Sequence, residues 1–196
     1  MSSILVIRHG QSEWNELGKW QGQENPPLTE LGMNQAREAS QNIGDIEAVY
    51  SSPLIRAATT AHIIAESIGI GPVQVLDDLM ERHAGDWQGL TRAQINQQFP
   101  GYLDSRQYPQ GWEPDDEVRE RVERGLRRIV AAHPTGSVLT VAHAGVLHAI
   151  EGMFNVEWVP LPNLSGRMVH FNHDTGSFSL GDRMVLIDEP TIPGQL

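Results

Sequence analysis

Two short, mostly apolar runs stand out in the pattern of hydrophobic and polar positions along the chain. Residues 4–7 read Ile-Leu-Val-Ile and residues 138–141 read Val-Leu-Thr-Val. Runs of this length are typical of strands that are buried on both faces of a parallel sheet. Shorter strands are also predicted, the last two of them as an edge hairpin: 48–50, 73–75, 168–171 and 177–180.

Apolar residues at helical spacing fill the intervals between these strands. One stripe runs from Leu54 to Ile68 and stops at Gly69. Ser52 followed by Pro53 predicts the start of that helix. Because strands and helices alternate, we predict the α/β class, as a three-layer α/β/α fold with a mainly parallel central sheet. Further helices are expected at 29–42, 91–99, 115–130 and 144–154.

A single domain over residues 1–196 is expected. A hydrophobic fraction of 39% and a charged fraction of 20% in 196 residues are typical of one globular domain. Residues 100–114 lack periodicity and are expected to form an irregular excursion near the mouth of a substrate site. The tail 189–196 contains two prolines and is expected to be loosely held.

The net charge of −11 argues against nucleic acid as a partner, since that binding depends on Lys and Arg that neutralise phosphates. Because the net charge of the protein repels anions, a pocket that binds an anion would need its own arginines. The sequence has no cysteine, which excludes disulfides, thiolate metal sites and a cysteine nucleophile. No run approaches the ~18 apolar residues of a membrane helix and no signal peptide is visible, so we expect a cytoplasmic protein with no membrane partner.

The two clearest strands end in similar polar sequences. Arg8-His9-Gly10 ends the first strand, and residues 142–145 (Ala-His-Ala-Gly) end the second. Because open α/β sheets bind ligands at the carboxyl ends of their strands, both histidines are expected at one edge. Arg56, in the first turn of a predicted helix, and Glu81, just before the glycine-rich stretch 85–89, can reach the same edge. This combination predicts a phosphate site with a histidine nucleophile.

In this order and at these strand ends, the residues resemble the histidine phosphatase (phosphoglycerate mutase-like) superfamily. The likeness covers nearly the whole chain in five ordered blocks, and it points to the small phosphatase branch. Asn25 departs from the family, which often has an acidic residue two positions before Pro-Leu-Thr. The blocks are residues 8–15, 21–32, 51–61, 81–89 and 142–145.

The resemblance implies a role for each residue of the predicted site. His9 would take the phosphoryl group, and Glu81 would protonate the leaving alkoxide and later take a proton from water. Arginines and neighbouring donors would hold the phosphoryl oxygens. No metal or other cofactor is implied, since side chains supply the cations. The implied catalytic residues are His9, Glu81, His143, Arg8 and Arg56, and the implied phosphate-binding residues are Arg8, Gly10, Asn15, Gln21, Gly22, Arg56, His143 and Ala144.

A phosphatase is favoured over a phosphoglycerate mutase, although both remain open, as does a silent phosphate-binding protein on the same fold. Mutases of the family resemble longer chains with a basic insertion between the acid and the second histidine, whereas the excursion here has one cation, Arg106. Arg82 and Arg106 leave room for a carboxylate on the substrate. The expected partner is a small phosphorylated metabolite, and a homodimer is possible. Candidate specificity residues are Arg82, His83, Trp20, Arg106 and Trp112, while other histidines, His148 among them, are expected to have packing or surface roles.

Overall fold

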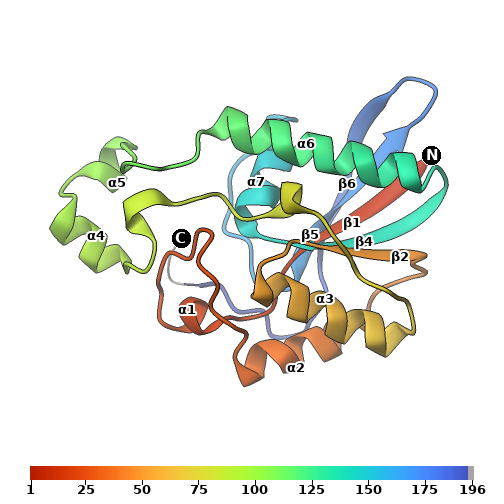
Figure 1. Cartoon of the computed structure of the whole chain (residues 1–196), viewed down its shortest axis with the longest axis horizontal. Coiled ribbons are helices and arrows are strands. Elements are labelled where there is room, and N and C mark those ends of the chain that lie inside the picture. Colours follow the sequence, from red (N-terminus) through yellow and green to blue (C-terminus); the bar gives the residue numbers. More distant parts are fainter. Residues whose placement is uncertain (194–196) are drawn as a thin grey trace.

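Six strands form one central sheet in the computed structural model, which describes residues 1–193 (Figure 1). They are β1 (Ser2–Arg8), β2 (Ala48–Ser51), β3 (Gln74–Val75), β4 (Gly136–Ala142), β5 (Ser165–Asn172) and β6 (Ser177–Val185). Their order across the sheet is β3-β2-β4-β1-β5-β6. The first four strands run parallel, β5 is antiparallel to β1, and β6 is antiparallel to β5. The mainly parallel sheet and its edge hairpin are confirmed.

Helices cover both faces of the sheet (Figure 1). They are α1 (Glu13–Glu16), α2 (Glu30–Ala39), α3 (Ile55–Ile68), α4 (Arg92–Gln98), α5 (Tyr102–Ser105), α6 (Asp115–Ala132) and α7 (Ala144–Gly152). Side chains of α2 and α3 pack in one apolar cluster, and those of α6 and α7 pack in another on the opposite face. The three-layer α/β/α arrangement is therefore confirmed. Among the described residues, no helix combines the length and the apolar character needed to span a bilayer.

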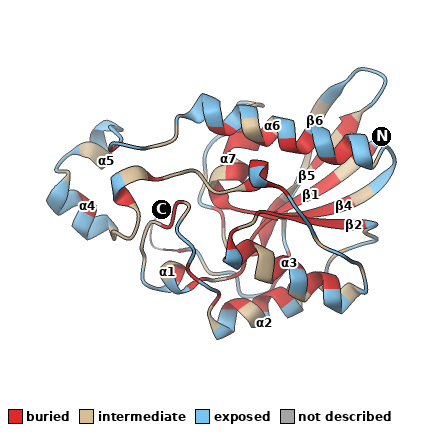
Figure 2. Ribbon diagram, viewed as in Figure 1, coloured by how far each residue is buried: buried red, intermediate tan, exposed pale blue. Residues whose placement is uncertain are grey.

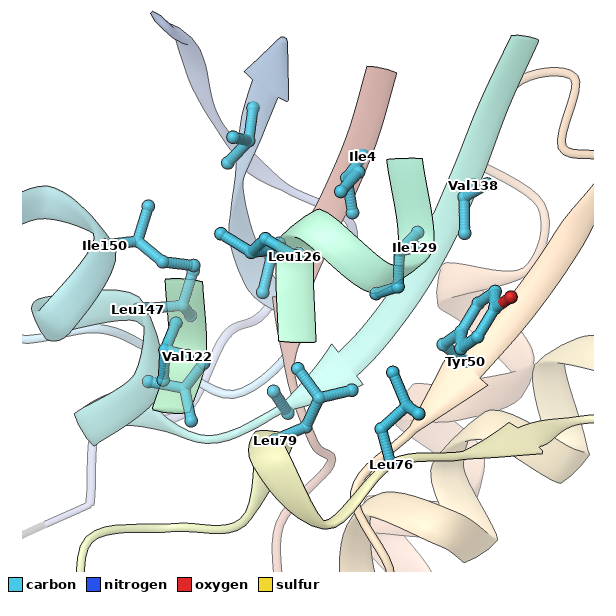
Figure 3. Close-up of a cluster of buried hydrophobic side chains, with 14 of the residues drawn as sticks. Ile4, Tyr50, Leu76, Leu79, Val122, Leu126, Ile129, Val138, Leu147 and Ile150 are labelled. Atoms are coloured by element: carbon cyan, nitrogen blue, oxygen red, sulfur yellow. The ribbon is translucent and has the colours of Figure 1, made fainter. Parts of the chain in front are cut away.

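The unbroken apolar run of β1 follows from burial on both of its faces. Leu5 and Ile7 belong to the cluster under α2 and α3, while Ile4 and Val6 belong to the cluster under α6 and α7. Figure 2 shows that buried residues concentrate in the sheet and on the inward sides of the helices. Figure 3 shows Ile4 beside Leu126 and other side chains of the α6 and α7 layer. Burying a large aliphatic side chain contributes about 1.5–3 kcal/mol, so this strand is a rigid support for the residues that follow it.

The start of α3 differs from the prediction. The helix begins at Ile55 rather than at Pro53, and no side chain of the residue before it caps it. The Ser52 hydroxyl instead accepts the Leu54 N–H at 3.2 Å, which forms a turn before the helix. Asn25 Oδ1 accepts the Ile55 N–H at 2.6 Å and so supplies the missing cap from a distant loop. An amide serves here as well as a carboxylate because only an acceptor is needed.

The end of α2 is also earlier than predicted. The helix ends at Ala39 rather than at Asn42. The Asn42 side chain donates to Leu186 O at 2.9 Å, a contact with the segment after β6. A tertiary hydrogen bond therefore takes this residue out of the helix.

The sequence predicts a loosely held tail over 189–196, and within it Thr191 is hydrogen-bonded to the body of the protein. Thr191 O accepts the Asn163 N–H at 2.9 Å, and the Thr191 hydroxyl donates to Asn163 Oδ1 at 3.0 Å. These bonds join the tail to the loop before β5. The rest of that expectation, for residues 194–196, lies outside the described residues.

The excursion 100–114 carries the one-turn helix α5 and lies with α4 away from the sheet (Figure 1). It returns to the body of the protein through a bridge between Ala84 and Trp112. The Asp86 N–H also donates to Gln110 O at 3.1 Å. The returning end of the excursion therefore lies beside the segment that follows Glu81.

Candidate active site

Two histidine rings meet where the two central strands end. β1 and β4 are neighbours with Arg8 aligned to Ala142, so the next residues, His9 and His143, emerge side by side. Their ring centroids are 5.2 Å apart. His9 is 1% exposed and His143 is fully buried. The structure therefore brings the two predicted histidines together at the carboxyl edge of the sheet.

The hydrogen bonds of His9 define its tautomer. Nδ1 lies 2.6 Å from Gly10 O, which can only accept, so Nδ1 carries the proton. Arg56 Nε–H donates to Nε2 at 3.2 Å, so Nε2 presents its lone pair. Burial, followed by the charges of Arg56 and Arg8, holds the pKa of His9 well below its usual value. In this neutral tautomer the Nε2 lone pair, which here accepts from Arg56, is the one that can attack phosphorus.

Two buried guanidinium groups flank this ring. Arg56 donates to Gly22 O at 2.8 Å and to Glu24 O at 2.7 Å, and Arg8 donates to Leu161 O. Burial lowers the pKa of each to about 10, with Glu81 opposing the shift, so both stay protonated at neutral pH. Within residues 1–193 neither forms an ion pair with a carboxylate. Because an uncompensated buried charge is costly, this pair is suited to binding an anion.

Three buried nitrogens near the ends of β1 and β4 have no hydrogen-bond partner in the described part of the chain: Arg8 Nε, Asn15 Nδ2 and His143 Nδ1. The other groups of the same side chains are engaged, since His143 Nε2 lies 2.8 Å from the Ser52 hydroxyl and Asn15 Oδ1 accepts from Asn163 at 3.2 Å. Burial, then the charge of Arg56, holds the pKa of His143 well below its usual value. Buried polar atoms are normally paired, so these orphans mark the place of a polar ligand.

Glu81 is held at the same edge by backbone donors. Its Oε1 accepts the Arg82 N–H at 2.8 Å, and its Oε2 accepts the Gly145 N–H at 3.3 Å. A Cβ atom on Gly145 would overlap Glu81 Oε1, so this close approach requires glycine. The first turn of α7 thus places the carboxylate beside the phosphate-binding residues.

A cavity of about 460 Å³ lies against Arg8 and Glu81. Arg8, Glu81, Gln21, Gly22 and Ala144 line what we call its inner end, and the buried His9, Asn15, Arg56 and His143 are not among the lining residues. The specificity candidates Arg82, Trp20 and Trp112 also line the cavity.

Three predicted site residues are placed elsewhere. The Gly10 N–H already donates to the Thr60 hydroxyl at 3.1 Å, so Gly10 is not a free phosphate donor. His83 Nδ1 lies between Gly111 O at 2.9 Å and Gly85 N at 3.0 Å, and neither His83 nor Arg106 is among the cavity-lining residues. Arg106 is exposed at the end of α5. The Gly10 N–H is taken by Thr60 of α3, and backbone groups of Gly85 and Gly111 hold the His83 ring.

The Arg82 charge is also less available than predicted. Its guanidinium forms a 2.7 Å ion pair with Asp115 and donates to Glu113 O at 2.7 Å. It also lies 5.3 Å from the centre of the Trp112 ring. Arg106 lies outside the cavity, and Arg82 is already paired with Asp115. The structure therefore does not support the prediction that these two arginines bind a carboxylate of the substrate.

Sequence reasoning missed the ion pair of Arg121 with Glu113. Arg121 donates to both Glu113 oxygens at 2.6 and 2.9 Å and to Met80 O at 2.6 Å. Glu113 Oε2 accepts the His83 N–H at 3.0 Å. Burial alone would raise the pKa of Glu113, but the Arg121 and His83 hydrogen bonds outweigh it and the pKa lies below its usual value. The pair holds the backbone on both sides of Glu81, and no local pattern around Arg121 signals it.

Sequence reasoning also missed Asn163, a buried side chain from the loop before β5. Its Nδ2 donates to His9 O at 2.9 Å and to Asn15 Oδ1 at 3.2 Å. Asn163 therefore joins the nucleophile segment to α1. Asn163 begins an Asn-Leu-Ser tripeptide, a pattern typical of N-glycosylation sites, which gives no indication of this contact.

The side chains that commonly bind metal ions do not form a cluster in the part of the chain that the structure describes. Across the described residues, no group of three or more His, Cys, Asp or Glu side chains has the arrangement of a metal site. The candidate site offers arginine and imidazole nitrogens instead.

Comparison with known proteins gives consistent results. The sequence pattern of the histidine phosphatase superfamily (branch 1) matches residues 4–179. An uncharacterized phosphatase, PhoE, of Bacillus subtilis is 34% identical over 152 residues, which cover 76% of each chain. A metal-independent phosphoserine phosphatase of Arabidopsis thaliana is 36% identical over 160 residues, which cover 76% of this chain and 67% of the relative. The solved structure of a mycobacterial glucosyl-3-phosphoglycerate phosphatase with VO3 superposes with a TM-score of 0.82 at 31% identity, covering 91% of this chain and 96% of that one.

Proposed function

Because this chain belongs to the histidine phosphatase superfamily, we propose that its reaction proceeds through a phosphohistidine on His9. The chain is a phosphoric monoester hydrolase, and its substrates are small phosphorylated metabolites. One observation carries the proposal. The Gly10 carbonyl keeps the proton of His9 on Nδ1, so Nε2 presents its lone pair beside the buried guanidinium of Arg56. That geometry is suited to in-line attack on a bound phosphoryl group.

In the first half of the reaction, a bond forms between His9 Nε2 and phosphorus while the bond from phosphorus to the ester oxygen breaks. Glu81 gives its proton to the leaving alkoxide. In the second half, Glu81 takes a proton from water, the water oxygen attacks phosphorus, and the nitrogen–phosphorus bond breaks. Inorganic phosphate leaves, and His9 returns to its neutral tautomer.

The charge on the phosphoryl group is stabilised by groups that are already in place. Arg8 and Arg56 supply fixed positive charge, and Arg56 is anchored through Gly22 O and Glu24 O. The orphaned nitrogens of Asn15 and His143 supply hydrogen bonds to the phosphoryl oxygens. Since these donors are buried before the ligand arrives, little reorganisation is needed during the reaction.

Hydrolysis of p-nitrophenyl phosphate by the purified protein tests this function. Rapid quenching in alkali during turnover of a radiolabelled monoester should trap an acid-labile phosphoryl group on the protein. His9→Ala should abolish both turnover and the label, whereas His62→Ala, which changes an exposed histidine of α3, should leave both unchanged. Turnover that survives in His9→Ala contradicts the proposal.

The same preparation distinguishes hydrolysis from the mutase alternative. A phosphatase releases phosphate from 3-phosphoglycerate without forming the 2-isomer and needs no bisphosphorylated primer. Isomerisation that depends on a primer, with no phosphate released, would favour the mutase.

We also propose that the reaction takes place in the cytoplasm. The absence of cysteine from all 196 residues supports a protein that does not depend on an oxidising compartment. Fractionation of cells that produce a tagged copy tests this, and recovery outside the cytoplasmic fraction contradicts it.

A further inference from the structure

The cavity continues well beyond the phosphate-binding residues. Its volume of about 460 Å³ is within the range of pockets that enclose a whole small-molecule ligand. We call the part lined by His148, Trp158, Tyr108 and Trp112 the outer end. The proposed function leaves this part of the cavity unexplained, because phosphate alone would occupy only the inner part.

Two stacked ring pairs from separate parts of the chain line the outer end. His148 of α7 stacks on Trp158 with centroids 5.4 Å apart and an angle of 29° between the rings. Tyr108 stacks on Trp112 in the excursion, with centroids 4.5 Å apart and an angle of 12°. Trp158 is 53% exposed and Tyr108 is 50% exposed. Each pair therefore has one supported ring and one ring left largely open.

His148 adds a polar group to this surface. Its Nε2 is buried and has no hydrogen-bond partner among residues 1–193. Burial lowers the pKa of His148 to about 4, with Glu151 opposing the shift, so the ring is neutral at neutral pH. A neutral imidazole can give or accept one hydrogen bond at Nε2, depending on its tautomer. This atom suits a hydroxyl group better than a second anion.

The charged side chains of the outer end are largely compensated. Arg82 is paired with Asp115 at 2.7 Å, and Glu151 is held by two hydrogen bonds from Arg183 at 2.7 and 2.9 Å. Arg119 is exposed to solvent on α6, where salt screens its charge. The available binding elements are therefore two half-exposed rings and one buried nitrogen of a neutral imidazole, which has no partner among the described residues.

We propose that the outer end is a subsite for a hydroxylated ring in the leaving group. The ring would lie against Trp158, and one of its hydroxyl groups would hydrogen-bond to His148 Nε2. This proposal rests on the proposed function, since the leaving group must be that of a monoester hydrolysed at His9. It makes His148 and Trp158 specificity-determining residues, although the sequence indicated only a packing role for His148.

Three esters of primary alcohols test the subsite: glucose 6-phosphate carries a hydroxylated ring, benzyl phosphate a bare ring, and glycerol 3-phosphate no ring. Trp158→Ala should lower kcat/KM about tenfold for both ring esters and less than about twofold for glycerol 3-phosphate. His148→Phe keeps a ring on Trp158 but removes the hydrogen bond. It should lower kcat/KM about fivefold for glucose 6-phosphate and leave benzyl phosphate unchanged.

Tyr102→Ala is the matched control, because it removes an aromatic ring of α5 that packs on Phe99 and does not line the cavity. It should leave the order of the three substrates unchanged. The subsite is overturned if either variant of the outer end slows glycerol 3-phosphate as much as glucose 6-phosphate, or if neither slows glucose 6-phosphate.

Calorimetric titration of His9→Ala protein separates this inference from the proposed function. Glucose 6-phosphate should bind more tightly than glycerol 3-phosphate, and Trp158→Ala should remove the difference. Equal affinities would overturn the subsite even if hydrolysis at His9 is real. A clear difference would support the subsite even if no turnover is found.

Discussion

The inner and outer ends of the cavity differ in how far their side chains are buried and in which interactions hold them. Next to the inner end, whose lining includes Arg8 and Gly22, the side chains of His9 and Arg56 are at most 1% exposed and are held by buried hydrogen bonds. At the outer end, Trp158 and Tyr108 are half exposed and are supported mainly by stacking. The charge that must be stabilised during phosphoryl transfer needs groups held in place before the reaction. Recognition of a leaving group needs only shape and a few weak contacts.

The largest effect is expected at the inner end, from Arg56→Lys. Lysine cannot reproduce the planar group that contacts His9 Nε2, Gly22 O and Glu24 O together. We expect kcat/KM for p-nitrophenyl phosphate to fall about 10²–10³-fold. Arg37→Lys, on the exposed side of α2, is the control. A loss below about tenfold would mean that the inner end does not depend on preorganised charge.

The next effect concerns the leaving group, through Glu81→Gln. Glutamine retains the size of the side chain but cannot transfer the proton. The kcat for an alkyl ester such as glycerol 3-phosphate should fall about 10²-fold, whereas p-nitrophenyl phosphate, with its good leaving group, should lose less than about tenfold. Equal losses on the two substrates would remove Glu81 from the acid role.

A smaller effect is expected where the two ends meet, from Arg121→Gln. This change leaves Glu113 largely buried without its two strongest hydrogen bonds and releases the backbone beside Glu81. We expect the free energy of unfolding to fall by about 2 kcal/mol in urea titrations, less than for a fully buried pair. The kcat for alkyl esters should fall more than that for p-nitrophenyl phosphate.

Arg127→Gln is the control for that variant, since it removes an exposed ion pair with Glu123 four residues earlier. It should cost less than about 1 kcal/mol. A loss of stability in Arg121→Gln without any change in the ratio of the two kcat values would assign the ion pair to stability alone.

The last effect, similar in size to that of Arg121→Gln, is on the pH dependence of stability. The pKa of His148 is lowered to about 4, so its contribution is present above the ordinary value near 6.5 and is lost as the pH falls toward 4. As the pH falls between these values, the free energy of unfolding should decrease in both proteins. The decrease should be about 2 kcal/mol smaller in His148→Phe than in the parent protein, after allowance for partial exposure. His62→Phe is the control. Parallel curves for His148→Phe and the parent would contradict the assignment.

The histidine pair could be predicted from the sequence because both residues follow strands that are recognisable by their apolar runs. The apolar run of β1 places His9, and the run of β4 places His143. Parallel pairing of neighbouring strands then leaves little freedom in where the two rings lie. The error at Gly10 is informative, since the backbone N–H expected for phosphate is used by Thr60 from α3.

The outer end and the support of Glu81 could not be predicted in the same way. Arg121 and Glu113 are eight residues apart, but Arg121 also donates to Asp78 O and Met80 O, 43 and 41 positions earlier in the chain. Asn163 contacts His9 across 154 positions. His148 and Trp158 line the same cavity as Tyr108 and Trp112 of the excursion, which are distant from them in the sequence. Local periodicity carries no information about such contacts.

The sequence by itself determined the α/β layers, the strand ends that carry the two histidines and the chemical class of the inner site. These depend on apolar periodicity and on residue types whose chemistry is intrinsic. Only the tertiary structure decided which ring nitrogen of His9 carries the proton, what holds Glu81, and which side chains line the rest of the cavity. Those properties depend on hydrogen bonds and burial between distant segments, and burial is a property of the assembled protein rather than of any single residue.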